Sequence, residues 1–337
     1  MILSTRPTVW FHKRAPDLGA SNLLSEVIAN AERRHPGIIP DLRSSQTLLI
    51  GSDYSGSHRT ARFDVTSVVV TNLENVATWN ENRSAVRDAL LPESRRMSYK
   101  ALNDRHRRAA LLPFLNTANM ISGMLISIAI DRDIRTVFHD QNVIVQYAAE
   151  YPELAGWKTG AIERALRIIH FVSLLLRGLS GPGQDVWWFT DQDEIVANDQ
   201  RLRSFVSLTA SISSHYLPQP LRHLRIGTTN CDTARRDIED YVAIPDFAAG
   251  VLQEFLENGD GRLLLSAPSL LLPRNDAIRP KASEIMDWFS DNTQPLRRLS
   301  FVIDEPLPGK LRITALRAHG SSDADASRLV SMADNWS

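Results

Sequence analysis

The sequence predicts an α/β fold in which a mixed sheet is flanked by helices. Short apolar runs that are rich in β-branched residues alternate with longer segments in which apolar residues recur at helical spacing. Clusters of Gly, Pro, Asn, Asp and Ser separate the two kinds of segment, as turns do. Three aspartates border apolar elements, and their order along the chain is the basis of the functional prediction.

The bulk composition is that of a folded globular protein. A chain of 337 residues can form one large core or two modest ones, and we expect one core with additions. Its 43% hydrophobic and 23% charged residues exclude a disordered or fibrous chain. The single cysteine, Cys231, excludes an internal disulfide and any zinc site that needs two thiolates, and it favours a cytoplasmic location.

Membrane insertion and secretion are not expected. The N-terminal residues 1–16 contain basic residues without the apolar run of a secretory signal. The most apolar stretch, 120–130, is far shorter than the roughly 20 residues that span a bilayer. The formal net charge of −1 provides no overall field that attracts nucleic acid, so any such binding depends on a local patch.

The first elements are expected after a proline-interrupted extension that covers residues 1–44 and includes a short helix over 21–33. The apolar run 47–50 predicts a buried strand that ends in a turn over 51–56. The β-branched run 63–71 predicts a second strand, paired with the first as a hairpin.

The middle of the chain predicts alternating helices and strands. Apolar residues recur at helical spacing over 98–120, and 123–130 follows as a third strand. Helices are predicted over 141–149 and 160–179, and the aromatic, β-branched run 186–190 predicts a strand that ends at Asp191.

The last part begins with Asp199, the expected N-cap of a helix over 200–216, and continues with a strand over 221–229. A helix is expected within 239–257, with Pro245 suited to its first turn. The runs 299–303 and 311–316 predict a hairpin around Pro306-Leu307-Pro308-Gly309, before a polar tail. These patterns divide the chain into an N-terminal extension (1–44), a core (45–260) and a C-terminal accessory region (261–337).

Two short motifs give the chain a resemblance to a known superfamily. The first is Ser52-Asp53-Tyr54-Ser55-Gly56, at the end of the first strand, and the second is Ala243-Ile244-Pro245-Asp246-Phe247-Ala248-Ala249-Gly250. Together with the order of the elements, they resemble the ribonuclease H-like superfamily. More narrowly, they resemble an uncharacterised prokaryotic branch whose first strand ends in an Asp-Glu-Ser-Gly type turn. The resemblance covers roughly residues 47–257.

This resemblance implies a nuclease that depends on Mg²⁺ or Mn²⁺. In the related fold the first aspartate bridges two metal ions and the later ones hold one each, so these roles fall to Asp53, Asp191 and Asp246. Metal-bound water would then attack the phosphodiester in line, because hard cations held by carboxylates leave positions open for water and phosphate. Tyr54 occupies a place where the branch often has a second acid. Candidates for a fourth, weaker ligand are Asp193, Glu194, Asp64 and Asp232.

Other interpretations compete with this one. Taken singly, each aspartate fits a turn, a strand end or a first helical turn, and only their joint order favours a metal site. A non-catalytic member of the same fold would serve as a binding or assembly subunit whose terminal additions contact a protein partner. The run Asp191-Gln192-Asp193 also resembles the nucleophile loop of haloacid dehalogenase-like phosphatases, although only Lys281 and Lys310 could supply the lysine of that site. Nucleotide-binding glycine loops and a His-Glu-x-x-His pair are absent from the sequence.

The expected partner is DNA, RNA or a nucleotide, and the sequence does not distinguish among them. The densest cationic segment lies between Arg95 and Arg108, and within it Lys100, Arg107 and Arg108 are the candidates that contact substrate phosphate. His58 is a further candidate for phosphate contact or proton transfer. Trp187 and Trp188 are expected to pack in the sheet rather than to stack on bases.

Overall fold

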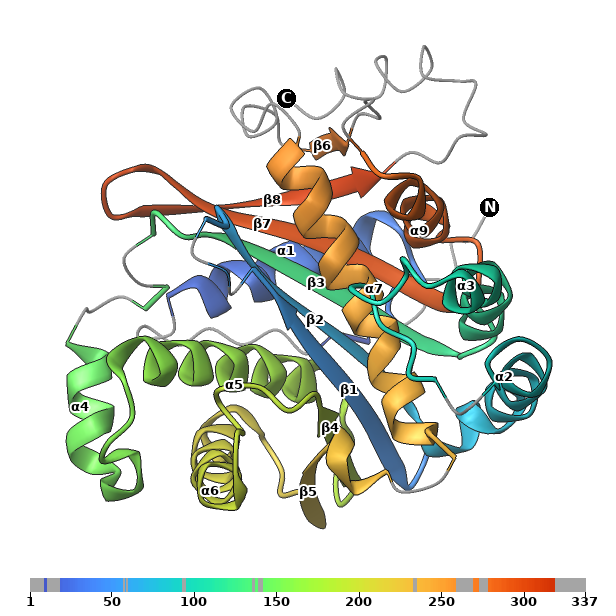
Figure 1. The fold of residues 1–337 in the computed structure, drawn as a ribbon. Coiled ribbons are helices and arrows are strands. Elements are labelled where there is room, and N and C mark those ends of the chain that lie inside the picture. The colour runs from blue at the N-terminus through green and yellow to red at the C-terminus, as the bar shows by residue number, and fades with distance from the viewer. Residues whose placement is uncertain are drawn as a thin grey trace, which may run out of the picture.

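The computed structural model describes the chain in ten segments, and the account below concerns these residues alone: 9–10, 19–56, 58, 60–92, 95–134, 137–138, 142–232, 235–258, 269–272 and 278–318. They form an α/β structure in which helices flank both faces of one mixed sheet (Figure 1). Within them, no helix is long and apolar enough to cross a membrane.

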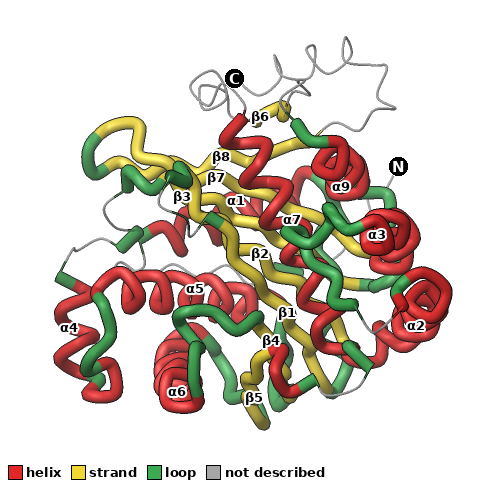
Figure 2. Tube along the Cα trace, in the orientation of Figure 1, coloured by secondary structure: helices red, strands yellow, loops and turns green. Residues whose placement is uncertain are grey.

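The sheet has eight strands in the order β5-β4-β1-β2-β3-β7-β8-β6. Figure 2 shows it as a twisted layer with β6 at one end and β5 at the other. The first three strands form an antiparallel meander, β4 and β5 are added parallel to β1, and β7 is added parallel to β3. The strands are β1 (Thr47–Ser55), β2 (Phe63–Asn72), β3 (Gly123–Asp131), β4 (Asp185–Thr190), β5 (His223–Thr228), β6 (Ser269–Leu272), β7 (Leu296–Leu307) and β8 (Lys310–Ala318).

Different helices cover the two faces of the sheet. One face packs against α2 (Ala77–Leu90), α3 (Arg105–Ala118), α7 (Asp237–Asn258) and α9 (Pro280–Ser290). The other packs against α1 (Ala20–Arg34), α5 (Thr159–Leu179) and α6 (Asp199–Tyr216), with α4 (Val143–Glu150) beside α5. In Figure 1, α7 crosses in front of the sheet and α1 lies behind it. Short 3₁₀ helices occur at η1 (Leu73–Val76), η3 (Pro152–Leu154) and η4 (Thr229–Cys231).

The local sequence explains most of these elements. β2 carries a β-branched run and is buried along most of its length, as expected of a central strand with both faces covered. α5 is buried almost all round because it lies between the sheet and α6, which its apolar composition permits. Asp104 caps α3 by accepting hydrogen bonds from the backbone N–H groups of His106 and Arg107.

Most predicted elements are present, with four differences. β1 continues through Ser55, so the predicted turn over 51–56 is wrong, and the turn conformation begins at Gly56, whose φ is 90°. Pairing with both β2 and β4 holds these polar residues in the strand. Asn198, not Asp199, caps α6. Strand β6 and the helices α2 and α9 were not predicted; the apolar residues of α2 are few, and β6 and α9 lie in or after a proline-rich stretch.

The fourth difference concerns the helix that carries Asp246. α7 begins at Asp237, so Pro245 and Asp246 lie inside the helix, and the prediction that they open it is wrong. A proline in this position leaves the carbonyl of Tyr241 without its usual helical donor, and the packing of the helix on the sheet maintains the helix through this break.

The C-terminal hairpin belongs to the same sheet as the preceding strands. β7 pairs with β3 over eight residue pairs, from Gly123–Leu296 to Ile130–Ile303, and β8 returns antiparallel to β7. The sheet therefore continues across the boundary predicted at residue 260. The division of the chain into extension, core and accessory region stays a prediction.

The contact between α7 and β1 depends on a glycine. A Cβ atom at Gly51 would lie 2.9 Å from two ring carbons of Tyr241 and 3.0 Å from a methyl carbon of Val69. The Tyr241 ring is buried, and its hydroxyl donates a hydrogen bond of 3.1 Å to the carbonyl oxygen of Leu49. The absence of a side chain at Gly51 thus lets α7 approach β1 closely.

We expect Gly51→Ala to destabilise the protein by about 1 to 3 kcal/mol, the usual cost of forcing an extra methyl group into a packed interior. The control is Gly160→Ala, because a Cβ at Gly160 meets nothing within 4 Å. Chemical denaturation of both variants measures the difference. Equal stability of Gly51→Ala and the wild type would show that the Gly51–Tyr241 contact does not constrain α7.

Candidate carboxylate site

Asp53 lies on β1, on the face of the sheet that α7 covers. Side chains alternate between the faces of a strand, and Leu49, four residues earlier, belongs to the same core cluster as Tyr241 of α7. Asp53 is only 7% exposed and is paired across the sheet with Ser67 of β2. A buried carboxyl group therefore projects towards α7.

Asp191 reaches the same place from the neighbouring strand. β4 runs parallel to β1 with Gly51 opposite Phe189 and Ser52 opposite Thr190, so the next residues along the two chains are Asp53 and Asp191. The Thr229 hydroxyl donates a hydrogen bond of 2.8 Å to Asp191 Oδ1. The sequence prediction that Asp191 directly follows a strand is confirmed.

Asp246 belongs to α7, the helix that covers this face of the sheet. Its Oδ2 accepts a hydrogen bond of 2.7 Å from the backbone N–H of Tyr99, in the segment that precedes α3. This bond fixes the carboxyl group between α7 and the segment around Tyr99. The side chain is partly buried.

The three carboxyl groups interact electrostatically. Burial raises the pKa of Asp53 well above its ordinary value, and repulsion from Asp246 and Asp191 raises it further. Burial also raises the pKa of Asp246 to about 6; the Tyr99 N–H opposes this rise, and repulsion from Asp191 adds to it. The fold thus places carboxyl groups close together where contact with water is reduced, so their negative charges repel one another.

Two cations offset part of this repulsion. Arg96 forms an ion pair of 2.6 Å with Asp191, and its charge lowers the pKa of both Asp53 and Asp246. Lys100 also lowers the pKa of Asp246, and its own side chain is exposed. Lys100 is one of the predicted substrate contacts. Arg96 is another of the six Lys and Arg residues in the same cationic segment, but it was not predicted to contact substrate.

The chemistry of these donors fits a hard divalent cation. Carboxylate oxygens are the ligands of Mg²⁺ and Mn²⁺, and a cation would remove the repulsion that raises the two pKa values. As the side chains stand, no group of three or more His, Cys, Asp or Glu residues in the described parts of the chain is arranged to hold a metal ion. Asp191 is instead turned to Arg96, so it would have to exchange this partner for a metal.

The proposed fourth ligands lie in different surroundings. Asp193 is near enough to raise the pKa of Asp53, but its Oδ2 lies 3.6 Å from Arg164, and Glu194 next to it is exposed. Asp232 accepts hydrogen bonds from the N–H groups of Ile238 and Glu239 at the start of α7, so it acts as a helix cap.

Asp64 and Tyr54 belong to the opposite face of the sheet. Asp64 forms an ion pair of 2.9 Å with Arg167 of α5, so its carboxylate is turned away from Asp53. The Tyr54 hydroxyl lies 2.9 Å from the Ser52 hydroxyl, and the Arg164 guanidinium lies 5.4 Å from the Tyr54 ring. The even positions of β1 face α5, so Tyr54 does not take the place of a ligand beside Asp53.

The other predicted substrate contacts have partners within the protein. Arg107 donates a hydrogen bond of 2.7 Å to the carbonyl oxygen of Arg96, and Arg108 pairs with Glu284 of α9. His58 is exposed, and its Nε2 lies 4.0 Å from a Glu257 carboxylate oxygen. Their role in substrate binding stays a prediction.

Sequence reasoning missed a polar pair beside Asp53. Ser67 of β2 and Ser127 of β3 are fully buried, and their hydroxyl groups lie 2.7 Å apart. Both serines lie on the face that α7 covers, in a cross-strand row that begins at Asp53. The available signal was a single serine inside each of two apolar strands, which periodicity alone does not connect.

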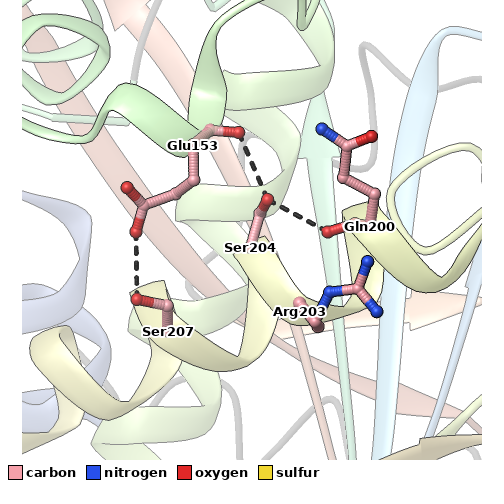
Figure 3. A pocket seen from close by; sticks show the side chains of 5 residues that line it. All are labelled: Glu153, Gln200, Arg203, Ser204 and Ser207. Carbon is pink, nitrogen blue, oxygen red and sulfur yellow. Dashed lines mark hydrogen bonds between the residues drawn. The ribbon is translucent and has the colours of Figure 1, made fainter.

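A separate hollow of about 300 Å³ lies between η3 and α6 (Figure 3). The Ser204 hydroxyl donates to the carbonyl oxygens of Glu153 and Gln200, and the Ser207 hydroxyl donates to the Glu153 carboxylate. The two serine hydroxyl groups that line it are thus paired within the hollow, and none of the predicted site residues belongs to it.

Comparison with known proteins finds no family model and no curated protein that matches the chain. A function for this protein therefore rests on the chemistry of the carboxylate site.

The raised pKa values give the metal-free protein a specific pH dependence. The folded-state pKa of Asp246, about 6, exceeds its ordinary value of 3.8, and that of Asp53 is raised as well. Folding therefore favours the protonated acids. Their stabilising contribution is complete below the unfolded-state pKa and is lost as pH rises through the folded-state values.

We expect Asp53→Asn to gain stability relative to the wild type as pH rises from about 5 to about 8 in a chelator, because the amide has no proton to lose. Urea denaturation at several pH values measures the difference. Asp64→Asn, on the other face, is the control and should show no such gain. A pH-independent difference for Asp53→Asn would mean that the folded protein does not raise the pKa of Asp53.

Proposed function

We propose that this protein is a divalent-metal-dependent nuclease with a ribonuclease H-like core, in which Asp53, Asp191 and Asp246 form the metal-binding acids. The observation that carries the proposal is geometric: buried Asp53 of β1 lies in register with Asp191 after β4, and Asp246 of α7 faces them. Burial, and then the charges of Asp246 and Asp191, raise the pKa of Asp53. Proteins seldom bury several mutually repelling carboxyl groups unless a function needs them, and perturbed acids are typical of active sites.

The arrangement of the strands supports the proposal. Three antiparallel strands are followed by two units, α5-β4 and α6-β5, that each add a strand parallel to β1. This is the order of elements on which the resemblance to the ribonuclease H-like superfamily was based. Asp53 stands on β1, the strand of the meander that pairs with β4, where the two parts of the sheet meet.

The residues present define the roles they would have. Asp53, Asp191 and Asp246 would hold the cations, and Arg96 and Lys100 would bind substrate phosphate beside them. When bound, the cations stabilise negative charge on the phosphoryl group and lower the pKa of the attacking water. Buried Ser67 and Ser127 form a pair of contacting hydroxyl groups in the cross-strand row that begins at Asp53.

A second candidate function is a non-catalytic binding or assembly subunit. The ion pair between Arg96 and Asp191 favours it, because an internal cation already neutralises part of the cluster. In that case Arg96 would be a permanent structural partner of the acids. The two functions differ in whether Mn²⁺ binds at the aspartates and whether phosphodiesters are then hydrolysed.

We expect Mn²⁺ to raise the melting temperature of the wild type, since a ligand at a hundred times its Kd contributes about 2.7 kcal/mol to folding. Asp53→Asn and Asp246→Asn should remove most of this shift and all Mn²⁺-dependent cleavage of oligonucleotides. Asp64→Asn is the matched control and should retain both. A shift that persists in Asp246→Asn would exclude this site, and a shift without cleavage would favour the binding subunit.

Arg96→Gln tests whether the arginine competes with the metal. We expect Mn²⁺ to bind roughly twofold to fivefold more tightly to this variant, because a partly exposed ion pair worth about 0.4 to 1 kcal/mol no longer opposes binding. Arg95→Gln is the control, since Arg95 pairs with Asp104. Calorimetric titration measures both, and unchanged affinity in Arg96→Gln would show that Asp191 keeps its arginine when metal binds.

A further inference from the structure

An aromatic surface leads to the carboxylate site along β4. α7 packs on β1, β2 and β3 and has only a few contacts with β4, so the same face of β4 and β5 is less covered. On this face Trp187 and Phe189 are half-buried and Arg225 is exposed. We call these three residues the β4–β5 surface.

Trp187 and Trp188 of β4 lie on opposite faces of the sheet. Trp188 is fully buried on the other face, where its indole N–H donates a hydrogen bond of 2.8 Å to the Ser52 hydroxyl. Trp187 points to the face of α7, and the Arg225 guanidinium lies 5.8 Å from its ring centre. The prediction that both tryptophans pack in the sheet is confirmed: Trp188 is buried in one core cluster, and Trp187 packs against the other while its side chain stays partly exposed.

The register of the sheet directs this surface to the acids. Trp187, Phe189 and Asp191 are alternate residues of one chain, so their side chains follow one another on one face. Gly227 lies opposite Phe189 on β5 and has no side chain to cover it. From Trp187 to Asp191 the chain advances about 13 Å at 3.3 Å per residue.

These groups match the chemistry of an unpaired nucleic-acid strand. Aromatic rings stack on any base whose face is free, and guanidinium groups bind backbone phosphate. Arg225 lies at the far end of the path, and Arg96 and Lys100 lie beside the acids at the other end. A path of this length needs more than one nucleotide to contact both the Trp187 ring and Asp191.

We propose that the β4–β5 surface binds single-stranded nucleic acid, with a base stacked on Trp187 and the backbone passing Arg225 towards Asp191. This inference rests on the proposed nuclease function, because it names the substrate class of the same site. Duplexes are excluded from this mode because their bases are stacked on one another and have no free face for the Trp187 ring.

The experiment measures binding of a fluorescent single-stranded oligonucleotide to the full chain in EDTA, by anisotropy. DNA and RNA of one sequence and the corresponding duplex are compared. We expect Trp187→Ala to bind the single strand about tenfold more weakly and Trp187→Phe to retain most of the affinity, as base stacking predicts. Arg225→Gln should reduce the slope of log affinity against log salt by about 0.7.

Trp157→Ala is the matched control. Trp157 is also half-buried beside an arginine, with the Arg201 guanidinium 4.9 Å from its ring centre, but Arg201 belongs to α6 on the other side of the sheet. This variant should bind as the wild type does. Arg225→Gln alters only an exposed side chain, so it tests the surface even if Trp187→Ala fails to fold.

The outcomes separate this inference from the nuclease proposal. Unchanged strand affinity in folded Trp187→Ala, an unchanged salt slope in Arg225→Gln, or equal binding of the duplex would overturn it, even if Mn²⁺-dependent cleavage occurs. Conversely, strand binding that needs Trp187 without any cleavage would support the surface and remove the nuclease. Tighter binding of RNA than DNA, or the reverse, would support it and identify the strand.

Discussion

The close packing of α7 on β1 is the constraint on which the rest of this structure depends. Where Tyr241 lies over Gly51, the helix approaches the strand as closely as a missing side chain permits. Two residues further along β1 is Asp53, and further along α7 is Asp246, so the same contact that closes the core brings two carboxyl groups together. Their repulsion opposes folding, and the buried apolar surface around them offsets it. The site is thus part of the core packing and not an addition to its surface.

Charged side chains on the two faces of the sheet have different partners. On the α5 face, Asp64 and Arg167 form a pair, and Asp193 lies near Arg164. At the carboxylate site on the α7 face, the three aspartates are opposed by Arg96 and Lys100, and Arg96 pairs with Asp191 in particular. An excess of negative charge in a poorly hydrated place favours a cation, and the structure creates such an excess at Asp53.

The site also lies where helical cover of the sheet ends. α7 protects β1 to β3, whereas the same face of β4 and β5 keeps Trp187 and Phe189 partly accessible. Asp191 follows the less covered strand, and Asp53 belongs to the covered one. In the proposed function, a substrate would therefore approach along β4, while Asp53 stays fixed in the core.

The sequence by itself determined the class of fold and most of its strands and helices, and it identified three aspartates as candidate site residues. Each of these inferences depends on local periodicity or on a short motif. It also placed Asp191 correctly after a strand. Tertiary structure decided what depends on contacts between distant segments: the extension of β1 through Ser55, the start of α7 before Pro245, and the union of the C-terminal hairpin with β3. Tertiary contacts also determine that Arg96, among six neighbouring basic residues, pairs with Asp191 and that Asp64 lies on the opposite face from Asp53. They leave the side chain of Trp187 partly exposed. The physical reason is that the face a strand residue occupies and the partner a charge finds are set by register and packing, which no local pattern encodes.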